Sequence, residues 1–223
     1  MNKEISEREK QTVSELRADF DARREARRPL ELNWRLNMNF VVGNQFAEIS
    51  PRGDIEDGGR QYFWQCREVY NHIAPIVETR LAKLSRVKAK VSVRPATAED
   101  DDTAAAETAA KLIAAVTAEN GLSELIGEAN AWSEVTGTAF YKIVWDKGKG
   151  MVLAAGGKVR EGDVRITVVS PFEIFPENLA VADLDAQPSV IHARVADASE
   201  VKRVWGVDAE GQEINVFSFE NAD

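Results

Sequence analysis

The sequence has very few of the residues that build disulfide frameworks or metal sites. Its 223 residues include one cysteine, Cys66, and two histidines, His72 and His192. A single cysteine excludes an internal disulfide, and these three side chains cannot form the four-ligand clusters that bind structural zinc. We therefore expect no disulfide-stabilised domain, no bound metal and no cofactor.

Long apolar runs are absent as well. A membrane-spanning helix needs about 18 consecutive apolar residues, and no such stretch here is free of charge. The N-terminus is charged from its third residue and lacks the apolar run of a secretory signal. We therefore expect no membrane contact and a cytoplasmic protein.

The common signatures of catalytic and nucleotide-binding loops are also missing. The sequence contains no G-x-S-x-G elbow, and two histidines leave few bases for a serine or cysteine nucleophile. The lysine- and glycine-rich segment 146–150 lacks the hydroxyl residue of a phosphate-binding loop and falls between two predicted strands. We therefore expect no enzymatic activity.

Acidic residues outnumber basic residues in the sequence as a whole. The sequence has 28 basic and 37 acidic residues, a net charge of −9. Residues 1–90 hold 17 basic and 14 acidic groups, whereas residues 91–223 hold 11 and 23. Because nucleic acids are bound through positive surface, a tight DNA clamp is disfavoured. The asymmetry is compatible with a partner or repeated subunit that meets one end.

The N-terminal region is predicted to form two consecutive helices. Residues 3–28 are densely charged with one apolar stripe, made of Ile5, Val13, Leu16 and Phe20. Pro29 suits the first turn of a second helix over residues 30–42, and residues 50–59 have the composition of a loop. Four arginines near the end of the first helix are interpreted as a solvated face that favours the helix dipole, with contact to phosphate or an acidic neighbour as the alternative. These are Arg23, Arg24, Arg27 and Arg28.

The rest of the sequence alternates between helical and strand-like patterns, which predicts an α+β fold. We expect N-terminal helices and an antiparallel helix pair, joined at Asn120 and Gly121, to pack with a small, mostly antiparallel sheet. The predicted helices cover residues 71–90, 103–119, 122–136 and 198–206. The predicted strands cover residues 91–95, 138–146, 163–170, 190–195 and 214–219, with an extended segment at 171–176. The tryptophans are expected in the core; they are Trp34, Trp64, Trp132, Trp145 and Trp205.

An acidic run, Glu99 to Asp102, is the strongest candidate for a metal site. Neighbouring carboxylates on one loop cannot all reach a single cation without ligands from elsewhere. We therefore interpret the run as a helix N-terminus, where negative charge meets the positive end of the helix dipole. The alternative is a metal-dependent nuclease that combines Asp100, Asp101 and Asp102 with a distant carboxylate such as Glu177.

Several short motifs follow one another along the chain. They are a Trp-to-Gln box at 34–46, an Asn-initiated helix at 71–79, a valine strand closed by proline at 91–95, a Gly-opened strand ending in Trp-Asp at 137–146, and a Ser-Pro-Phe turn at 170–172. In this order they resemble the N-terminal half of the portal proteins of tailed bacteriophages. The positions that carry the resemblance are Trp34, Asn37, Phe40, Gly43, Gln45, Asn71, Pro95, Gly137, Trp145, Asp146 and Pro171.

The resemblance implies a structural subunit that forms a ring, usually dodecameric, at one vertex of the capsid. Double-stranded DNA would pass through the ring without sequence specificity during packaging and ejection. The implied partners are identical subunits, terminase, capsid or scaffold, and head-completion or tail proteins. The implied location is the virion, with the host cytoplasm during assembly. The chief alternative is a virion or mobile-element adaptor protein without a DNA conduit.

The resemblance also implies a division of the chain. Residues 1–50 would form an N-terminal helical arm, and residues 51–223 a wing-like α+β domain. Complete portals are longer, so the chain is expected to stop before the stem, clip and crown, and no tunnel-lining residue can be assigned. A net acidic ring would let DNA slide, and the apolar surfaces around Trp34 and Phe40 would be buried by neighbouring subunits.

Overall fold

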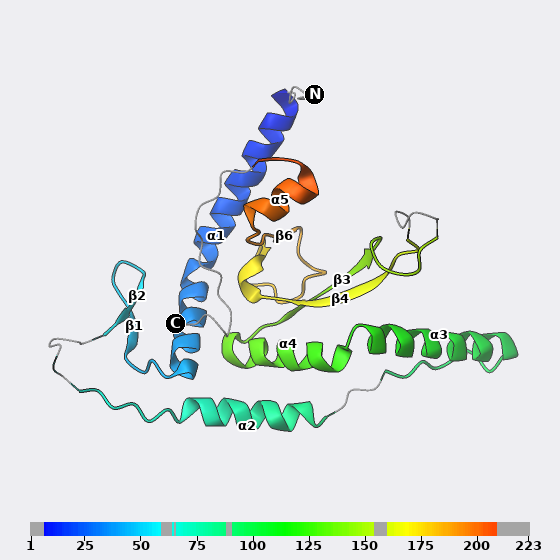
Figure 1. Cartoon of the computed structure of the whole chain (residues 1–223), viewed down its shortest axis with the longest axis horizontal. Coiled ribbons are helices and arrows are strands. Elements are labelled where there is room, and N and C mark those ends of the chain that lie inside the picture. The colour runs from blue at the N-terminus through cyan, green and yellow to red at the C-terminus, as the bar shows by residue number, and fades with distance from the viewer. Residues whose placement is uncertain (1–6, 59–63, 65, 88–90, 154–159, 209–223) are drawn as a thin grey trace. The chain divides into compact units, whose positions relative to one another are not determined.

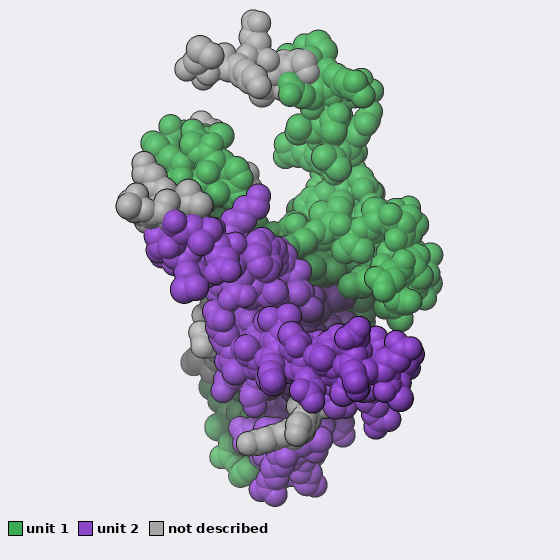
Figure 2. Space-filling view, turned by 90° about the vertical axis from the view of Figure 1, so that its right-hand side faces the viewer, with its two compact units in different colours: residues 1–74, 171–223 green, residues 75–170 purple. Residues whose placement is uncertain are grey.

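The computed structural model describes residues 7–58, 64, 66–87, 91–153 and 160–208. This part of the chain contains five α-helices, a short 3₁₀ helix and three two-stranded antiparallel sheets, which confirms the α+β class (Figure 1). Residue contacts define two compact units (Figure 2): unit 1 comprises residues 1–74 and 171–223, and unit 2 comprises residues 75–170. The functional division at residue 50 stays a prediction.

Unit 1 is built on one long helix, α1, which runs from Glu7 to Val42 through Pro29. The predicted boundary between two helices is therefore wrong. Proline lacks the N–H that bonds to the fourth preceding carbonyl, so it weakens a helix interior. Arg27 before Pro29 and Trp34 after it are both buried. We attribute the continuity of α1 to this packing on both sides of the proline.

Residues 7–18 of α1 are exposed, as predicted. Val13 and Leu16 of its apolar stripe are exposed. Phe20 instead packs edge-on against Phe175, with ring centroids 4.8 Å apart. Residues 3–6, including Ile5, lie outside the described residues.

A small hairpin follows α1, and its second strand lies within the predicted loop at residues 50–59. Strand β1 (Ala47–Ile49) pairs with β2 (Ile55–Asp57). The turn between them is closed by hydrogen bonds, because the Ser50 N–H donates to the Asp54 carbonyl at 2.8 Å. Strands of three residues are too short for a hydrophobic alternation to be recognised. The hydrophobic pattern of the sequence therefore does not predict β1 and β2.

The remainder of unit 1 comes from the C-terminal part of the chain. A 3₁₀ turn, η1 (Pro171–Glu173), precedes β5 (Ile174–Pro176), which pairs with β6 (Val190–His192). The extended conformation predicted for residues 171–176 is thus confirmed only in its second half. Helix α5 (Ala198–Trp205) ends at Gly206, as predicted. The predicted strand 214–219 lies outside the described residues.

Unit 2 contains most of α2 (Ile73–Ser85), together with α3 (Asp100–Glu119) and α4 (Leu122–Thr136). Helices α3 and α4 have nearly the predicted bounds, but they follow one another almost in line and do not fold back as an antiparallel pair (Figure 1). At the two-residue joint Asn120 keeps a right-handed helical conformation and Gly121 adopts the left-handed one, and α4 continues in nearly the direction of α3. Packing of α4 on a strand of unit 2 replaces the expected packing between the two helices.

The sheet of unit 2 is the predicted hairpin, β3 (Phe140–Asp146) with β4 (Asp163–Val169). The predicted strand at residues 91–95 is wrong, since the segment belongs to no sheet of the described chain. Among the tryptophans, Trp34 and Trp132 are buried as expected. The expectation is wrong for the other three, which are exposed: Trp64, Trp145 and Trp205.

Candidate functional site

Arg27 of α1 is buried against the segment that begins at Pro171, with 2% of the residue exposed. Its Nη1 donates to the carbonyl oxygens of Pro171 and Ile174 at 3.1 and 2.5 Å. Its Nη2 donates to the Phe172 carbonyl at 2.8 Å and to the Glu31 carboxylate at 3.2 Å. One guanidinium therefore binds three backbone carbonyls of the Pro171–Ile174 segment to α1.

These contacts explain how a charged group is held in the interior. Burial lowers the pKa of Arg27, whereas attraction to Glu31 and the hydrogen bond with it raise the pKa. The guanidinium carbon lies 3.7 Å from the ring centroid of Phe175 and 5.7 Å from that of Trp34. Charge-assisted hydrogen bonds and cation–π contacts together offset the loss of hydration.

Arg23, one turn earlier on α1, extends this arrangement. Its Nη1 donates to the carbonyls of Phe175 and Ser189 at 3.2 and 3.1 Å, and its Nη2 donates to Asp19 at 2.7 Å. The interpretation of the arginine cluster as a solvated face is therefore wrong for Arg23 and Arg27. We call these two side chains the arginine clamp.

The predicted positions Trp34 and Pro171 lie beside the clamp. Trp34 packs edge-on against Phe172 at 5.4 Å between ring centroids, and Pro171 is fully buried. The expectation that a neighbouring subunit buries Trp34 is wrong, because the same chain buries it. Asn37 is exposed on α1, and Phe40 is half-buried.

A second group of predicted positions organises the end of α1. Gly43 has a φ of 106°, a conformation that favours glycine, at the point where α1 stops. The Gln45 side chain donates to the Phe40 carbonyl at 2.7 Å, and Asn71 donates to the Val41 carbonyl at 2.8 Å. Asn71 also accepts from the first two N–H groups of α2, at 3.0 and 3.1 Å. These side chains cap helix termini.

The remaining predicted positions lie in unit 2. Gly137, with a φ of 81°, ends α4, and Pro95 lies in the unpaired segment. Asp146 accepts from the Gly148 N–H at 2.8 Å and forms an ion pair with Arg165 at 3.5 Å. The predicted motif thus consists of packing, capping and turn positions that are spread over both units.

Strand β3 has large apolar side chains that are exposed on one face. Tyr141, Ile143 and Trp145 alternate along it and lie on one face, and they are 47%, 67% and 60% exposed. The register places β4 residues Val168, Ile166 and Val164 opposite them on the same face. We call these six side chains the hairpin face. Contiguous apolar side chains in water are typical of a surface that another protein covers.

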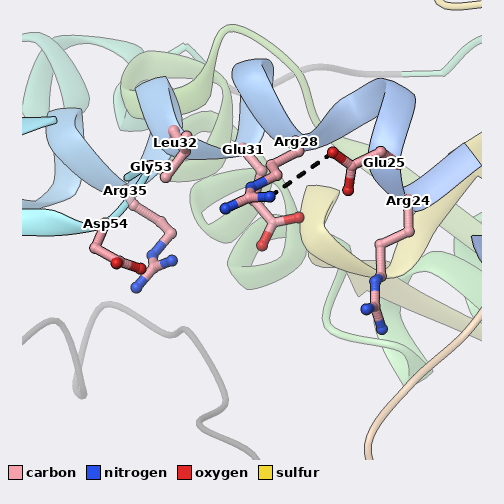
Figure 3. Close-up of a pocket in the computed structure, with 8 residues that line it drawn as sticks. All are labelled: Arg24, Glu25, Arg28, Glu31, Leu32, Arg35, Gly53 and Asp54. Atoms are coloured by element: carbon pink, nitrogen blue, oxygen red, sulfur yellow. Dashed lines mark ion pairs between the residues drawn. The ribbon is translucent and has the colours of Figure 1, made fainter. Parts of the chain in front are cut away.

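A groove of about 240 Å³ lies along α1 on the side of the β1–β2 turn (Figure 3). Its lining is evenly balanced in charge, with three arginines and three acidic side chains, and Arg28 forms an ion pair with Glu25 at 3.7 Å. Equal numbers of opposite charges give the groove no preference for an anion. The lining residues are Arg24, Glu25, Arg28, Glu31, Leu32, Arg35, Gly53 and Asp54.

The acidic run occupies the first turn of α3, which confirms its interpretation as a helix N-terminus. Asp102 accepts from the N–H and the hydroxyl of Thr97, at 3.0 and 2.5 Å. Glu177 accepts from the Ser189 hydroxyl at 2.6 Å. Among the described residues, no group of three or more His, Cys, Asp or Glu side chains is arranged to hold a metal ion. None of the described helices has the length and apolarity to cross a membrane.

The sequence contains a signal for the arginine clamp that the prediction did not use. Phe20, Arg23, Arg27, Trp34 and Met38 are separated by three, four, seven and four residues, the spacing of one helix face. The arginines therefore continue the face formed by the apolar residues, and a long arginine stem can lie in an apolar layer.

Comparisons with known proteins identify no relative. No protein-family model matches the chain, and neither a curated protein nor a solved structure shows significant similarity to it.

Proposed function

We propose that this chain is a structural subunit of the portal ring of a tailed bacteriophage, the conduit at the capsid vertex through which double-stranded DNA is packaged and ejected. It performs no catalysis. It assembles with identical subunits in the host cytoplasm and remains in the virion. Its other partners are terminase, capsid or scaffold, and head-completion or tail proteins.

The hairpin face is the observation that carries this proposal. Burying a large apolar side chain contributes roughly 1.5–3 kcal/mol. Scaled by the exposure of Tyr141, Ile143 and Trp145, complete burial of these three would contribute about 4 kcal/mol per subunit contact. In a closed ring each subunit makes this contact with one neighbour, so the gain is repeated around the ring.

Two further features support a structural role. The motif positions Trp34, Gly43, Asn71, Gly137 and Pro171 pack, cap or terminate helices. The net charge of −9 is compatible with a duplex that slides past the protein and is not held by it.

The oligomeric state of the purified chain tests the proposal. We expect native mass spectrometry to detect a closed oligomer and negative-stain electron microscopy to show rings with a central hole. Ile143→Glu places a charge on the hairpin face and should weaken association at least tenfold. Leu112→Glu on α3 is the matched control, since Leu112 is exposed to a similar extent (64%) outside the hairpin; it should leave association unchanged.

Two results would contradict the proposal. A strict monomer over a wide range of concentration would remove the subunit role and favour the adaptor alternative. Equal weakening by Ile143→Glu and Leu112→Glu would show that the hairpin face is not the contact.

A further inference from the structure

The two outer edges of the β3–β4 hairpin differ. On the β4 side, the Asn120 side chain occupies the edge: its Nδ2 donates to the Val164 carbonyl at 3.0 Å, and its Oδ1 accepts from the Ile166 N–H at 3.0 Å. A single amide side chain thus makes the pair of hydrogen bonds that a neighbouring strand would make. This edge is filled within the chain.

On the β3 side, the edge is unoccupied among the described residues, whose sheet here contains β3 and β4 alone. Ile143 and Trp145 lie opposite Ile166 and Val164, whose backbone groups point outward to Asn120. In an antiparallel pair, two residues opposite each other direct their backbone groups either both toward each other or both away from each other. Tyr141, Ile143 and Trp145 therefore direct their N–H and C=O groups away from β4. We call this the open edge of β3. An exposed apolar edge strand is a ready template for another strand.

The described part of the chain also contains a strand-like segment that has no strand partner. Residues 91–95, Val-Ser-Val-Arg-Pro, have the alternation of a strand but belong to no sheet of the described structure. Val91 is 59% exposed. Pro95 has no N–H and suits the end of a short strand. The segment offers backbone donors and acceptors that have no strand partner in the described part of the chain.

Within unit 2 the segment does not pair with the open edge, and α3 lies between the two in the view of Figure 1. Residue Thr97 is tied to Asp102 at the start of α3, whereas Asn120, at the opposite end of α3, contacts the hairpin. A helix of this length spans about 30 Å. In Figure 1 residues 91–99 run along the side of α3 that faces away from β3 and β4. The segment is therefore placed to meet the hairpin of another copy.

We propose that residues 91–95 of one copy add as a third strand to the open edge of β3 in the next copy. The inference rests on the proposed ring and specifies its subunit contact. Addition in the correct register places Val91 and Val93 beside the hairpin face, and it places Ser92 and Arg94 on the opposite face, which carries Lys142 and Arg165. Donor and acceptor are different surfaces of the subunit, so the contact runs head to tail, as a ring requires.

Disulfide trapping between two differently labelled copies tests the strand addition. The full chain with Cys66→Ser serves as the background, because Cys66 is its only cysteine. Chains with Val93→Cys are mixed with chains that carry Tyr141→Cys, Ile143→Cys or Trp145→Cys. Each chain has one thiol, so a mixed disulfide can form only between copies. We expect one of the three mixtures to give a cross-linked dimer on a non-reducing gel.

Ser92→Cys is the matched control. A shift of one residue moves a side chain to the other face of a strand, so Ser92→Cys should give at most about a tenth of the Val93→Cys cross-link with the same partners. Leu112→Cys, which is exposed and lies outside the hairpin, should give none. Equal trapping by Ser92→Cys and Val93→Cys would overturn the strand addition, as would the absence of any Val93→Cys product.

Native mass spectrometry of the same samples separates this inference from the proposed function. Oligomers that form without the Val93→Cys cross-link would overturn the strand addition alone. Cross-linked assemblies of open, variable length would support the strand addition and contradict the closed ring. A strict monomer would overturn both.

Discussion

At the scale of single residues, the buried guanidinium of Arg27 joins α1 to a distant segment of unit 1. Its guanidinium binds the carbonyls of Pro171, Phe172 and Ile174, which are separated from it by more than 140 positions in the sequence. These carbonyls are buried or partly buried, so they depend on a donor supplied by the protein. A buried charge that binds several acceptors is costly to remove, because the acceptors are left without partners.

We expect Arg27→Met to destabilise unit 1 by roughly 3 kcal/mol, since methionine keeps an apolar stem and removes the donors. Arg27→Lys should retain part of this stability. Arg24→Met changes an exposed arginine of the same helix and should cost less than about 0.5 kcal/mol. Chemical denaturation followed by tryptophan fluorescence measures these differences, and similar midpoints for Arg27→Met and Arg24→Met would contradict the role assigned to the clamp.

At the scale of elements, α1 shows how packing overrides a local signal. Pro29 predicts a helix boundary, yet the helix continues because Arg27 and Trp34 are buried on either side of it. The proline therefore lies in a helix interior at a cost that the surrounding contacts offset.

We expect Pro29→Ala to stabilise the protein by about 1–2 kcal/mol, because alanine restores the missing N–H and is the best helix former. The gain is smaller than the full penalty of a helical proline, since proline also restricts the unfolded chain. Leu30→Ala, at the next exposed position, serves as the control and should have little effect. Thermal unfolding monitored by circular dichroism gives the answer; a loss of stability in Pro29→Ala would mean that α1 requires the proline.

Prediction from sequence succeeded where one segment contains its own signal. The hairpin of β3 and β4, helices α3 to α5, and the helix stop at Gly43 all follow from local alternation, spacing or turn residues. It failed where a distant segment decides the outcome. Burial of Arg23 and Arg27 depends on carbonyls beyond residue 170. The nearly collinear arrangement of α3 and α4 depends on the packing of α4 against β4.

At the scale of the whole molecule, an excess of acidic residues determines how the chain meets nucleic acid. The chain carries a net charge of −9, and 23 of its 37 acidic residues lie after residue 90. Of the four clustered arginines, Arg23 and Arg27 are occupied by carbonyls and carboxylates of the same chain. The other two, Arg24 and Arg28, are exposed, and over the whole chain the acidic residues outnumber the basic ones.

We therefore expect the chain to bind duplex DNA with a Kd weaker than about 100 μM at physiological salt. Fluorescence anisotropy of a short labelled duplex, measured from low to physiological salt, tests this. Random-sequence and phage-derived duplexes should behave alike. Micromolar binding that weakens steeply as salt is added would contradict the expectation and would favour a phosphate-contacting role for Arg24 and Arg28.

The Asn120 amide also has a consequence for how copies add to one another. Because it already fills the β4 side, each hairpin can receive one strand and never two, so a row of copies has a polarity with two unlike ends. A copy that can receive but cannot supply a strand would stop growth at one end only. Because a closed ring needs every contact, a small admixture of such copies should prevent closure of each ring that incorporates one.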